Sequence, residues 1–279
     1  MIASRVRSVA QRLRHAPGLR SCDVLWNLVR PGYELALNAL GSGTGVEVRV
    51  GGHPIRLSPR FAGTGWEAIE YTAYSAFAEA VRPGDIVYDI GAHIGTYSIL
   101  ALQKSAPNGS VVAYEPAELT RAFLARHLRC NGVESRAIVR PVCCGSGDGI
   151  ASLYYHEGEM DGDSGLLPAP GLASKNVPLR TIDSEVADLG LTPKIIKIDV
   201  EGWEWEVLKG AETTLRRHRP LLFLSLHPRA LAALGTTSKA VQEWVRTRGY
   251  RLQMLDADHE LHVIATSDDS SHSGSQIAR

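Results

Sequence analysis

Short apolar segments alternate along this chain with longer segments of helical periodicity, and this alternation limits the folds that the chain can adopt. Strands joined by crossover helices lie parallel in one sheet that is covered on both faces. Two closing strands, 250–256 and 261–265, are separated only by a short turn and must be antiparallel. The pattern therefore predicts a doubly wound α/β domain. Its other expected elements are strands at 85–90, 110–114, 137–142, 194–199 and 221–227, and helices at 96–104, 117–131, 203–217 and 238–248.

The chain divides into an extension, a domain and a tail. Residues 81–266 form the predicted α/β domain, and residues 1–80 form an N-terminal extension that packs on it. In the extension, residues 46–57 alternate apolar and polar residues around two glycines and predict a hairpin, and residues 66–81 have helical periodicity. The tail, 267–279, is rich in Ser, Asp and Gly and is predicted to be disordered.

Residues 1–15 combine arginines with apolar residues at helical spacing and predict a short basic amphipathic helix. Three interpretations stay open: a solvated helix, a peripheral contact with a membrane or partner protein, and a mitochondrial presequence. The whole chain has 30 Lys and Arg against 30 Asp and Glu, so its net charge is zero. Nucleic-acid binding needs clustered positive charge to neutralise phosphates, and we therefore expect no nucleic-acid partner.

The four cysteines, Cys22, Cys130, Cys143 and Cys144, show no pattern of a disulfide framework. No CxxC or HxxxH spacing indicates a zinc site, and we expect no bound metal. A reducing, cytoplasmic compartment is the expected location. No apolar run approaches the roughly 20 residues that a transmembrane helix needs.

The first motif is the sequence VYDIGAHIG at 87–95, an apolar strand that ends in an acid and leads through two glycines into a helix. A glycine lets the backbone turn sharply and lets a ligand approach without a Cβ in the way. In open α/β sheets the ligand crevice lies at this carboxyl edge of the strands. The carboxylate of Asp89 suits a cationic ligand better than a pyrophosphate, and neither a GxGxxG fingerprint nor a phosphate loop is present. A structural tight turn is the alternative.

The next predicted strand ends in Glu115, within VVAYEP at 111–116. A carboxylate has two acceptor oxygens, and at this place in such a fold it can accept hydrogen bonds from both hydroxyls of a ribose. Together with Asp89, Gly91 and Gly95, Glu115 predicts a nucleoside-binding edge.

Two carboxylates, Asp199 and Glu201, follow another predicted strand in the sequence IKIDVEGWE at 196–204. Both are placed to meet a substrate or cofactor at the carboxyl edge of the sheet. The alternative is that Glu201 only stabilises the start of the next helix through the helix dipole.

These motifs and the sequence RPLLFLSLHP at 219–228 resemble the FkbM family of S-adenosylmethionine-dependent methyltransferases, over roughly residues 66–256. The resemblance implies a Rossmann-like, seven-stranded, mostly parallel sheet with an antiparallel final hairpin. It also implies methyl transfer from S-adenosyl-L-methionine, most often to a hydroxyl oxygen of a sugar, a glycolipid or a polyketide-type natural product. The expected partner is therefore a small-molecule or glycan acceptor.

The resemblance further implies a cofactor site in which Glu115 holds the ribose and the turn that contains Cys143 borders the adenine. His93 stands where the family usually has Asn, and it either contacts the cofactor or fills the turn. The residues expected to bind the cofactor are Asp89, Gly91, His93, Gly95, Glu115, Cys143 and Asp199.

For catalysis, the resemblance implies that Asp199 and Glu201 face the methyl-transfer site, with His227 opposite them. We expect His227 to act as general base, because the unperturbed pKa of histidine suits proton transfer near neutral pH. Asp199 is the alternative base, or holds the ammonium group of the cofactor or the substrate. The alternative for His227 is a structural histidine before Pro228. Ser225 stands where the family commonly has Glu, which argues against a carboxylate-assisted His227 and against a carboxylate metal site there.

Two segments are expected to shape the acceptor site: the loop 156–176, which joins further predicted strands at 150–155 and 177–181, and residues 63–74. In the second segment, aromatic side chains either cover the pocket mouth or pack in the core. Two other functions stay open. One is an NAD(P)-dependent oxidoreductase, which the missing GxGxxG fingerprint opposes. The other is a non-catalytic scaffold that keeps the cofactor fold and binds a membrane or partner through its N-terminus.

Overall fold

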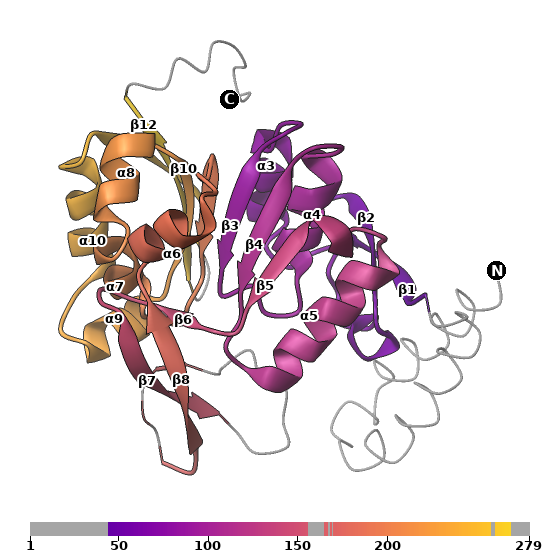
Figure 1. The fold of residues 1–279 in the computed structure, drawn as a ribbon, viewed down its shortest axis with the longest axis horizontal. Helices are drawn as coiled ribbons and strands as arrows, with labels where there is room; N and C mark the ends of the chain where they lie inside the picture. Colours follow the sequence, from indigo (N-terminus) through magenta and orange to yellow (C-terminus); the bar gives the residue numbers. More distant parts are fainter. Residues whose placement is uncertain (1–43, 156–164, 167, 169, 258–259, 269–279) are drawn as a thin grey trace.

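The computed structural model describes residues 44–155, 165, 166, 168, 170–257 and 260–268 (Figure 1). The basic helix expected at 1–15, much of the loop 156–176 and most of the tail 267–279 lie outside the described residues.

Seven strands form the central sheet (Figure 1): β3 (Ile86–Ile90), β4 (Ser110–Tyr114), β5 (Ala137–Arg140), β9 (Ile195–Ile198), β10 (Leu221–Leu226), β11 (Tyr250–Ala257) and β12 (Leu261–Ser267). Their order across the sheet is β11-β12-β10-β9-β3-β4-β5. From β10 to β5 every neighbouring pair is parallel, whereas β12 is antiparallel to both β10 and β11. This topology confirms the Rossmann-like sheet with an antiparallel final hairpin.

Helices cover both faces of this sheet (Figure 1). The first face carries α3 (Tyr71–Ala80), α4 (Thr96–Lys104), α5 (Glu118–Cys130) and the hairpin of β1 (Val46–Val50) and β2 (His53–Leu57). The second carries α6 (Ile182–Leu189), α7 (Glu204–Lys209), α8 (Glu212–His218), α9 (Pro228–Ala233) and α10 (Ser238–Arg246). Successive strand residues point to opposite faces, so Val87 packs in the first core and Tyr88 in the second. The apolar strands of the sequence are thus buried from both sides, as is usual for parallel sheets.

A smaller sheet is formed by β6 (Cys143–Cys144), β7 (Gly149–Tyr155) and β8 (Ala173–Arg180), in the order β6-β8-β7. β7 and β8 correspond to the strands expected at 150–155 and 177–181, and they pair antiparallel. Cys143, Cys144 and Leu153 of this sheet line a cavity at the carboxyl edge of the central strands. Two short 3-10 helices lie at Pro59–Phe61 and Glu134–Arg136.

The helix expected at 203–217 is in fact two helices, α7 and α8, with Gly210 between them. The carbonyl oxygen of Gly145 lies only 1.9 Å from the place that a Cβ of Gly210 would take. The carbonyl of Gly210 also accepts a hydrogen bond from the N–H of Asp183 at 3.0 Å. The continuous periodicity of the sequence is therefore interrupted by contacts with distant parts of the chain.

Other helix boundaries, in contrast, are set by the local backbone and by capping residues. The helix expected from residue 66 begins at Tyr71, because Glu70 before it has left-handed backbone with φ 45°. The short helices α6 and α9 are not predicted from the sequence. α6 follows Thr181, whose side chain accepts the N–H of Ser184, and α9 begins at Pro228. Both helices are too short to show a clear periodic pattern.

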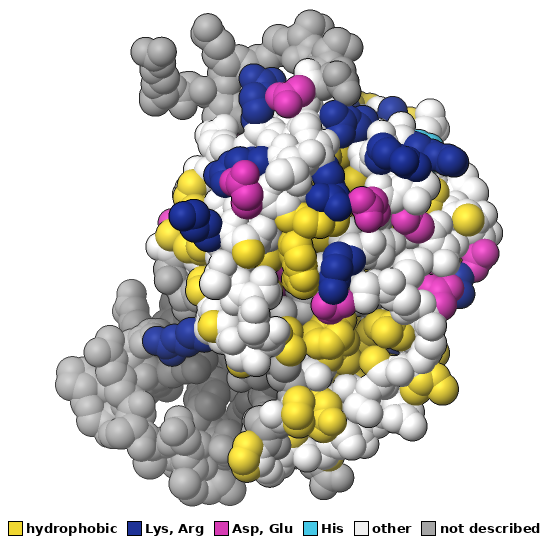
Figure 2. All heavy atoms as spheres, turned by 90° about the vertical axis from the view of Figure 1, so that its left-hand side faces the viewer, with side chains coloured by type: hydrophobic (Ala, Val, Ile, Leu, Met, Phe, Trp, Pro, Cys, Tyr) yellow, Lys and Arg dark blue, Asp and Glu magenta, His cyan; other side chains and the backbone are white. Residues whose placement is uncertain are grey.

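Basic and acidic side chains are interspersed on the face of the molecule that Figure 2 shows. No patch of a single sign covers this face, in keeping with the balanced charge of the sequence. Among the residues that the structure describes, no helix has both the length and the apolar character needed to cross a bilayer.

Gly91 connects the ends of three neighbouring strands. It follows β3, and its N–H donates to the carbonyl of Tyr114 at the end of β4 at 3.0 Å. Its φ is 81°, and a Cβ at this position would lie 1.7 Å from the carbonyl oxygen of Asp199, which follows β9. Both the backbone conformation and this close contact therefore require glycine.

Replacing Gly91 tests this contact. Gly91→Ala is expected to lower the free energy of unfolding by at least about 2 kcal/mol, because backbone strain and steric overlap add. Gly132 has a φ of 65° and nothing within 4 Å of its would-be Cβ, so Gly132→Ala is the matched control. We expect the control to cost only about 1 kcal/mol. Urea unfolding followed by circular dichroism measures both, and equal losses would contradict the role of the Asp199 contact.

Candidate active site

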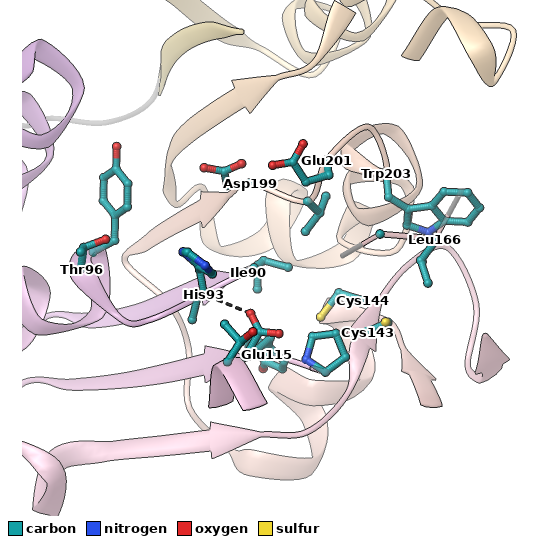
Figure 3. Close-up of a pocket in the computed structure, with 18 of the residues that line it drawn as sticks. Ile90, His93, Thr96, Glu115, Cys143, Cys144, Leu166, Asp199, Glu201 and Trp203 are labelled. Atoms are coloured by element: carbon teal, nitrogen blue, oxygen red, sulfur yellow. Dashed lines mark hydrogen bonds between the residues drawn. The ribbon is translucent and has the colours of Figure 1, made fainter. Parts of the chain in front are cut away.

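A cavity of about 300 Å³ lies at the carboxyl edge of the central sheet, where β3, β4 and β9 end (Figure 3). Its walls come from the loop after β3, from β6 and β7 of the small sheet, and from the segment before α3. Five of the residues expected to bind the cofactor line it: Gly91, His93, Glu115, Cys143 and Asp199. The structure therefore brings together side chains from four distant parts of the chain.

Glu115 is held by two backbone groups at the end of β4. Its Oε2 accepts the N–H of His93 at 2.9 Å (Figure 3), and its Oε1 accepts the N–H of Ala117 at 2.8 Å. Burial raises the pKa of Glu115 to about 7, although these two hydrogen bonds act in the opposite direction. The carboxylate is thus fixed in orientation and can change its ionisation near neutral pH.

Two of the residues expected to contact the cofactor do not line the cavity. Asp89 lies behind it, 1% exposed, and accepts a hydrogen bond from Ser98 Oγ at 2.5 Å. Burial raises the pKa of Asp89 to about 6. Gly95 precedes α4, and a Cβ there would lie 2.4 Å from the Leu124 side chain. In the structure these residues position the loop that carries Gly91 and His93.

His93 and Cys143 belong to the cavity wall. In Figure 3 the His93 ring lies between the carboxyl groups of Glu115 and Asp199. Burial lowers the pKa of His93, although Asp199 acts in the opposite direction. Burial raises the pKa of the Cys143 thiol to about 12, which keeps it protonated. The thiol is therefore a small wall group and a poor nucleophile.

His227, at the end of β10, is surrounded by carboxylates. Its Nδ1 lies 2.8 Å from Glu204 Oε1, while its Nε2 lies 3.3 Å from Glu201 Oε2, 3.3 Å from Glu260 Oε2 and 3.8 Å from Asp199 Oδ1. Burial lowers the pKa of His227, but Glu204, Asp199 and Glu201 outweigh it and raise the pKa to about 9. His227 therefore does not have the unperturbed pKa that made it the expected general base. Its assignment as the base stays a prediction.

Lys197 places a positive charge inside the sheet, directly below this cluster. Its side chain is 2% exposed, and its Nζ donates to Asp199 Oδ2 at 2.9 Å and to Ser225 Oγ at 2.6 Å. Burial lowers the pKa of Lys197, but Asp199 and other acids outweigh it and the net shift is upward. Ser225 Oγ also lies 3.0 Å from His262 Nδ1. Ser225 therefore links the lysine to the final hairpin.

Several residues of this site were not identified from the sequence. Glu260 lies in the turn between β11 and β12, where nothing in the local sequence distinguishes it from a solvated acid. Glu204 begins α7 and is fully buried, although its position alone suggests a surface residue. Lys197 did have a signal, because a charged residue within an apolar parallel strand requires a buried partner.

The backbone around the cavity is strained. Outside glycine, positive φ angles occur among the described residues at Glu70, His93, Glu201 and Arg219. All but Arg219 line the cavity. Left-handed backbone in non-glycine residues is costly and is typical of functional sites. This clustering supports the cavity as the place where the chain does its chemistry.

Comparison with known proteins identifies the family. The sequence profile of the Methyltransferase FkbM domain matches residues 89–252, which span β3 to β11. The chain belongs to the FkbM methyltransferase family. The match covers β3, β4, β9 and β10, whose carboxyl ends carry Glu115, Asp199 and His227.

Individual relatives are distant. The chain is 28% identical over 149 residues to the hexuronic acid methyltransferase AglP of Haloferax volcanii, covering 50% of this chain and 54% of that protein. It is 32% identical over 106 residues to the 31-O-demethyl-FK506 methyltransferase FkbM of Streptomyces tacrolimicus, covering 37% of each. A solved FkbM methyltransferase of Methylobacillus flagellatus aligns with a TM-score of 0.48 at 18% identity, covering 70% of this chain and 53% of that one. The matched part of this chain thus spans about half or less of these curated relatives.

Removing the buried lysine tests its role in the site. Lys197→Met is expected to lower the free energy of unfolding by about 3 kcal/mol, because it leaves Asp199 without its cation. Lys209 pairs with Glu206 on the surface and is 38% exposed, so Lys209→Met is the matched control. We expect the control to change stability by less than about 0.5 kcal/mol. Guanidinium unfolding measures both, and a similarly small loss in Lys197→Met would contradict the role assigned to the pair.

Proposed function

We propose that this chain is an S-adenosylmethionine-dependent methyltransferase that acts on a hydroxyl of a sugar, a glycolipid or a polyketide-type natural product. One observation carries the proposal: in a chain of the FkbM family, Glu115 and the Asp199–Glu201 pair face the same cavity. The first suits a nucleoside and the second suits the transfer chemistry. The likeness to AglP, a hexuronic acid methyltransferase, and to FkbM, a 31-O-demethyl-FK506 methyltransferase, supports an oxygen-rich acceptor.

The residues of the cavity fit S-adenosylmethionine. Gly91 lines the cavity with backbone, Glu115 offers two oriented oxygens for ribose hydroxyls, and Cys143 offers a small apolar wall. When bound, the cofactor supplies a methyl group on a sulfonium sulfur, which keeps the electron pair of the broken carbon–sulfur bond. Asp199 adds a carboxylate to the cavity wall, and its negative charge attracts the positively charged sulfonium.

The acceptor side of the cavity is lined by Asp199 and Glu201, and His227 lies next to them, 3.3 Å from Glu201 Oε2. In this proposal these residues hold the acceptor hydroxyl in line with the methyl group and take up its proton as the new carbon–oxygen bond forms. Glu201 is 41% exposed, so an acceptor can reach it from the cavity. Trp66 and Tyr74 also line the cavity, although both are largely buried in the core.

The cellular setting of this activity is also a proposal. Cys143 and Cys144 are buried free thiols, which supports work in a reducing compartment such as the cytoplasm. The Arg-rich segment 1–15 is proposed to make a peripheral contact with a membrane that carries glycolipid acceptors.

Two assays test the function. Calorimetric titration is expected to show binding of S-adenosylmethionine and S-adenosylhomocysteine, and no binding of NADH. Incubation with methyl-labelled cofactor and a panel of hydroxylated glycans, glycolipids and polyketides, followed by mass spectrometry, is expected to show a labelled product. Binding of NADH alone would support the oxidoreductase, and binding of none of the three would support the scaffold.

Cofactor affinity is expected to depend on pH through Glu115. Burial raises the pKa of this carboxyl group to about 7; the nearby charge of Arg121 lowers it and that of Asp89 raises it. Ribose hydroxyls donate to the ionised carboxylate, so lowering the pH from 8 to 6 is expected to weaken S-adenosylhomocysteine binding about tenfold. Calorimetry at each pH measures this. Glu115→Gln is expected to bind more weakly at pH 8 and to show no such fall, and a parallel fall in the variant would assign the effect to another group.

His227→Ala is expected to retain S-adenosylhomocysteine binding and to lose at least about a hundredfold in turnover. The expectation follows from the position of His227 among the acceptor-side carboxylates Asp199 and Glu201. Turnover is measured with saturating acceptor. Unchanged turnover would leave His227 with a structural role only.

A further inference from the structure

We propose that Asp199, His227 and Glu260 bind a divalent metal ion at the acceptor side of the cavity. These residues follow β9, follow β10 and lie in the turn between β11 and β12, so they are far apart in sequence and meet only in the fold. This explains why the spacing of Cys and His along the chain gives no sign of a metal site. The proposed ion lies beside the cavity, because Asp199 and Glu260 both line it.

The donor atoms are already close to a coordinating arrangement. One nitrogen of His227 and one carboxylate oxygen from each of Asp199 and Glu260 all lie within 4.8 Å of one another. His227 Nε2 is 3.3 Å from Glu260 Oε2 and 3.8 Å from Asp199 Oδ1. Two donors that each lie about 2.1 Å from the same ion are separated by about 3.0 to 3.5 Å. An ion therefore fits between these atoms with only small side-chain movements.

A buried carboxylate orients the histidine for this role. Glu204 Oε1 lies 2.8 Å from His227 Nδ1 and also accepts the N–H of Gly202 at 2.8 Å. Glu204 is 0% exposed, so this contact is shielded from water. A metal-bound histidine commonly donates its other ring N–H to a carboxylate, which fixes the ring and makes the bound nitrogen more basic. Here the arrangement points Nε2 at Asp199 and Glu260.

The local charge also favours a cation. Four carboxylates, Asp199, Glu201, Glu204 and Glu260, lie within 4 Å of His227 nitrogens. Lys197 contacts Asp199 through Oδ2, whereas the oxygen that faces His227 is Oδ1. Lys197 and the proton on His227 do not balance these four carboxylates, and a divalent ion that replaces this proton adds one net positive charge.

The donor set selects a class of ion. Carboxylate oxygens suit Mg²⁺ and Mn²⁺, and a single imidazole nitrogen favours Mn²⁺ over Mg²⁺. Because Asp199 and Glu260 line the cavity, oxygens of a hydroxylated acceptor in the cavity would complete the coordination of such an ion. An acceptor hydroxyl on the ion loses its proton more readily, and Glu201, 3.3 Å from His227 Nε2, is placed to take that proton. This catalytic consequence rests on the proposed methyl transfer, whereas metal binding itself does not.

Mn²⁺ binding to the full chain, freed of metal by dialysis against a chelator, tests the site. Calorimetry and Mn²⁺ electron paramagnetic resonance are expected to show one ion per chain. Glu260→Gln and His227→Ala are each expected to weaken binding at least tenfold, and Glu204→Gln by ten- to a hundredfold. Glu118 is 73% exposed and pairs with Lys175 on the surface, so Glu118→Gln is the matched control and is expected to bind as the wild type does. Circular dichroism confirms that each variant is folded.

The outcomes separate the metal site from the methyl transfer. Absence of Mn²⁺ binding to the wild type, or equal binding to folded Glu260→Gln and Glu118→Gln, overturns the metal site. Mn²⁺ binding that depends on Glu260 and His227 supports the site even when no acceptor is methylated, in which case only the proposed function fails. Methyl transfer that a chelator leaves unchanged in a chain without bound metal keeps the proposed function and overturns the catalytic role of the ion, while the binding experiments alone decide the site.

Discussion

The buried ion pair between Lys197 and Asp199 is the interaction on which the candidate site depends. An isolated charge inside a sheet is very costly, and the lysine is stabilised there by Asp199, by the hydroxyl of Ser225 and by the Tyr97 ring, whose centroid lies 4.7 Å from its Nζ. The pair in turn holds Asp199 with one oxygen directed at Lys197 and the other toward His227. Carboxylates can gather at this edge of the sheet because a cation already lies beneath them.

The backbone adds a second constraint. The loop after β3 contacts the segment after β9 so closely that Gly91 leaves no room for a side chain beside the Asp199 carbonyl. His93 and Glu201 then adopt left-handed conformations on either side of this contact. Such conformations persist only where the surrounding structure determines them. The positions of Glu115, Asp199 and Glu201 therefore follow from the packing of strand ends, and much less from local preferences.

The sequence predicts the elements whose signals are local. The helix at 96–104 and the strand at 110–114 have the same bounds in the structure, because apolar segments there end at clear breaks. The helix expected at 203–217 is wrong as one element, because the contact between Gly145 and Gly210 forms only in the fold. In the candidate site, too, contacts between distant segments cannot be predicted from the local sequence. The Gly91 and Glu115 positions follow from strand ends, whereas Glu260 reaches His227 only because the final hairpin returns next to β10.

Ser225 shows how the acidic environment of His227 is built in this chain. The resemblance implies Glu at this position, so the sequence alone predicts that His227 lacks a carboxylate neighbour there. The structure instead supplies Glu204 from α7 and Glu260 from the final turn, at 2.8 Å and 3.3 Å from the imidazole nitrogens. Ser225 meanwhile accepts a hydrogen bond from Lys197, a contact in which a second carboxylate would compete with Asp199 for the same cation. The carboxylates around His227 therefore come from α7 and from the final turn, and they do not depend on the residue at position 225.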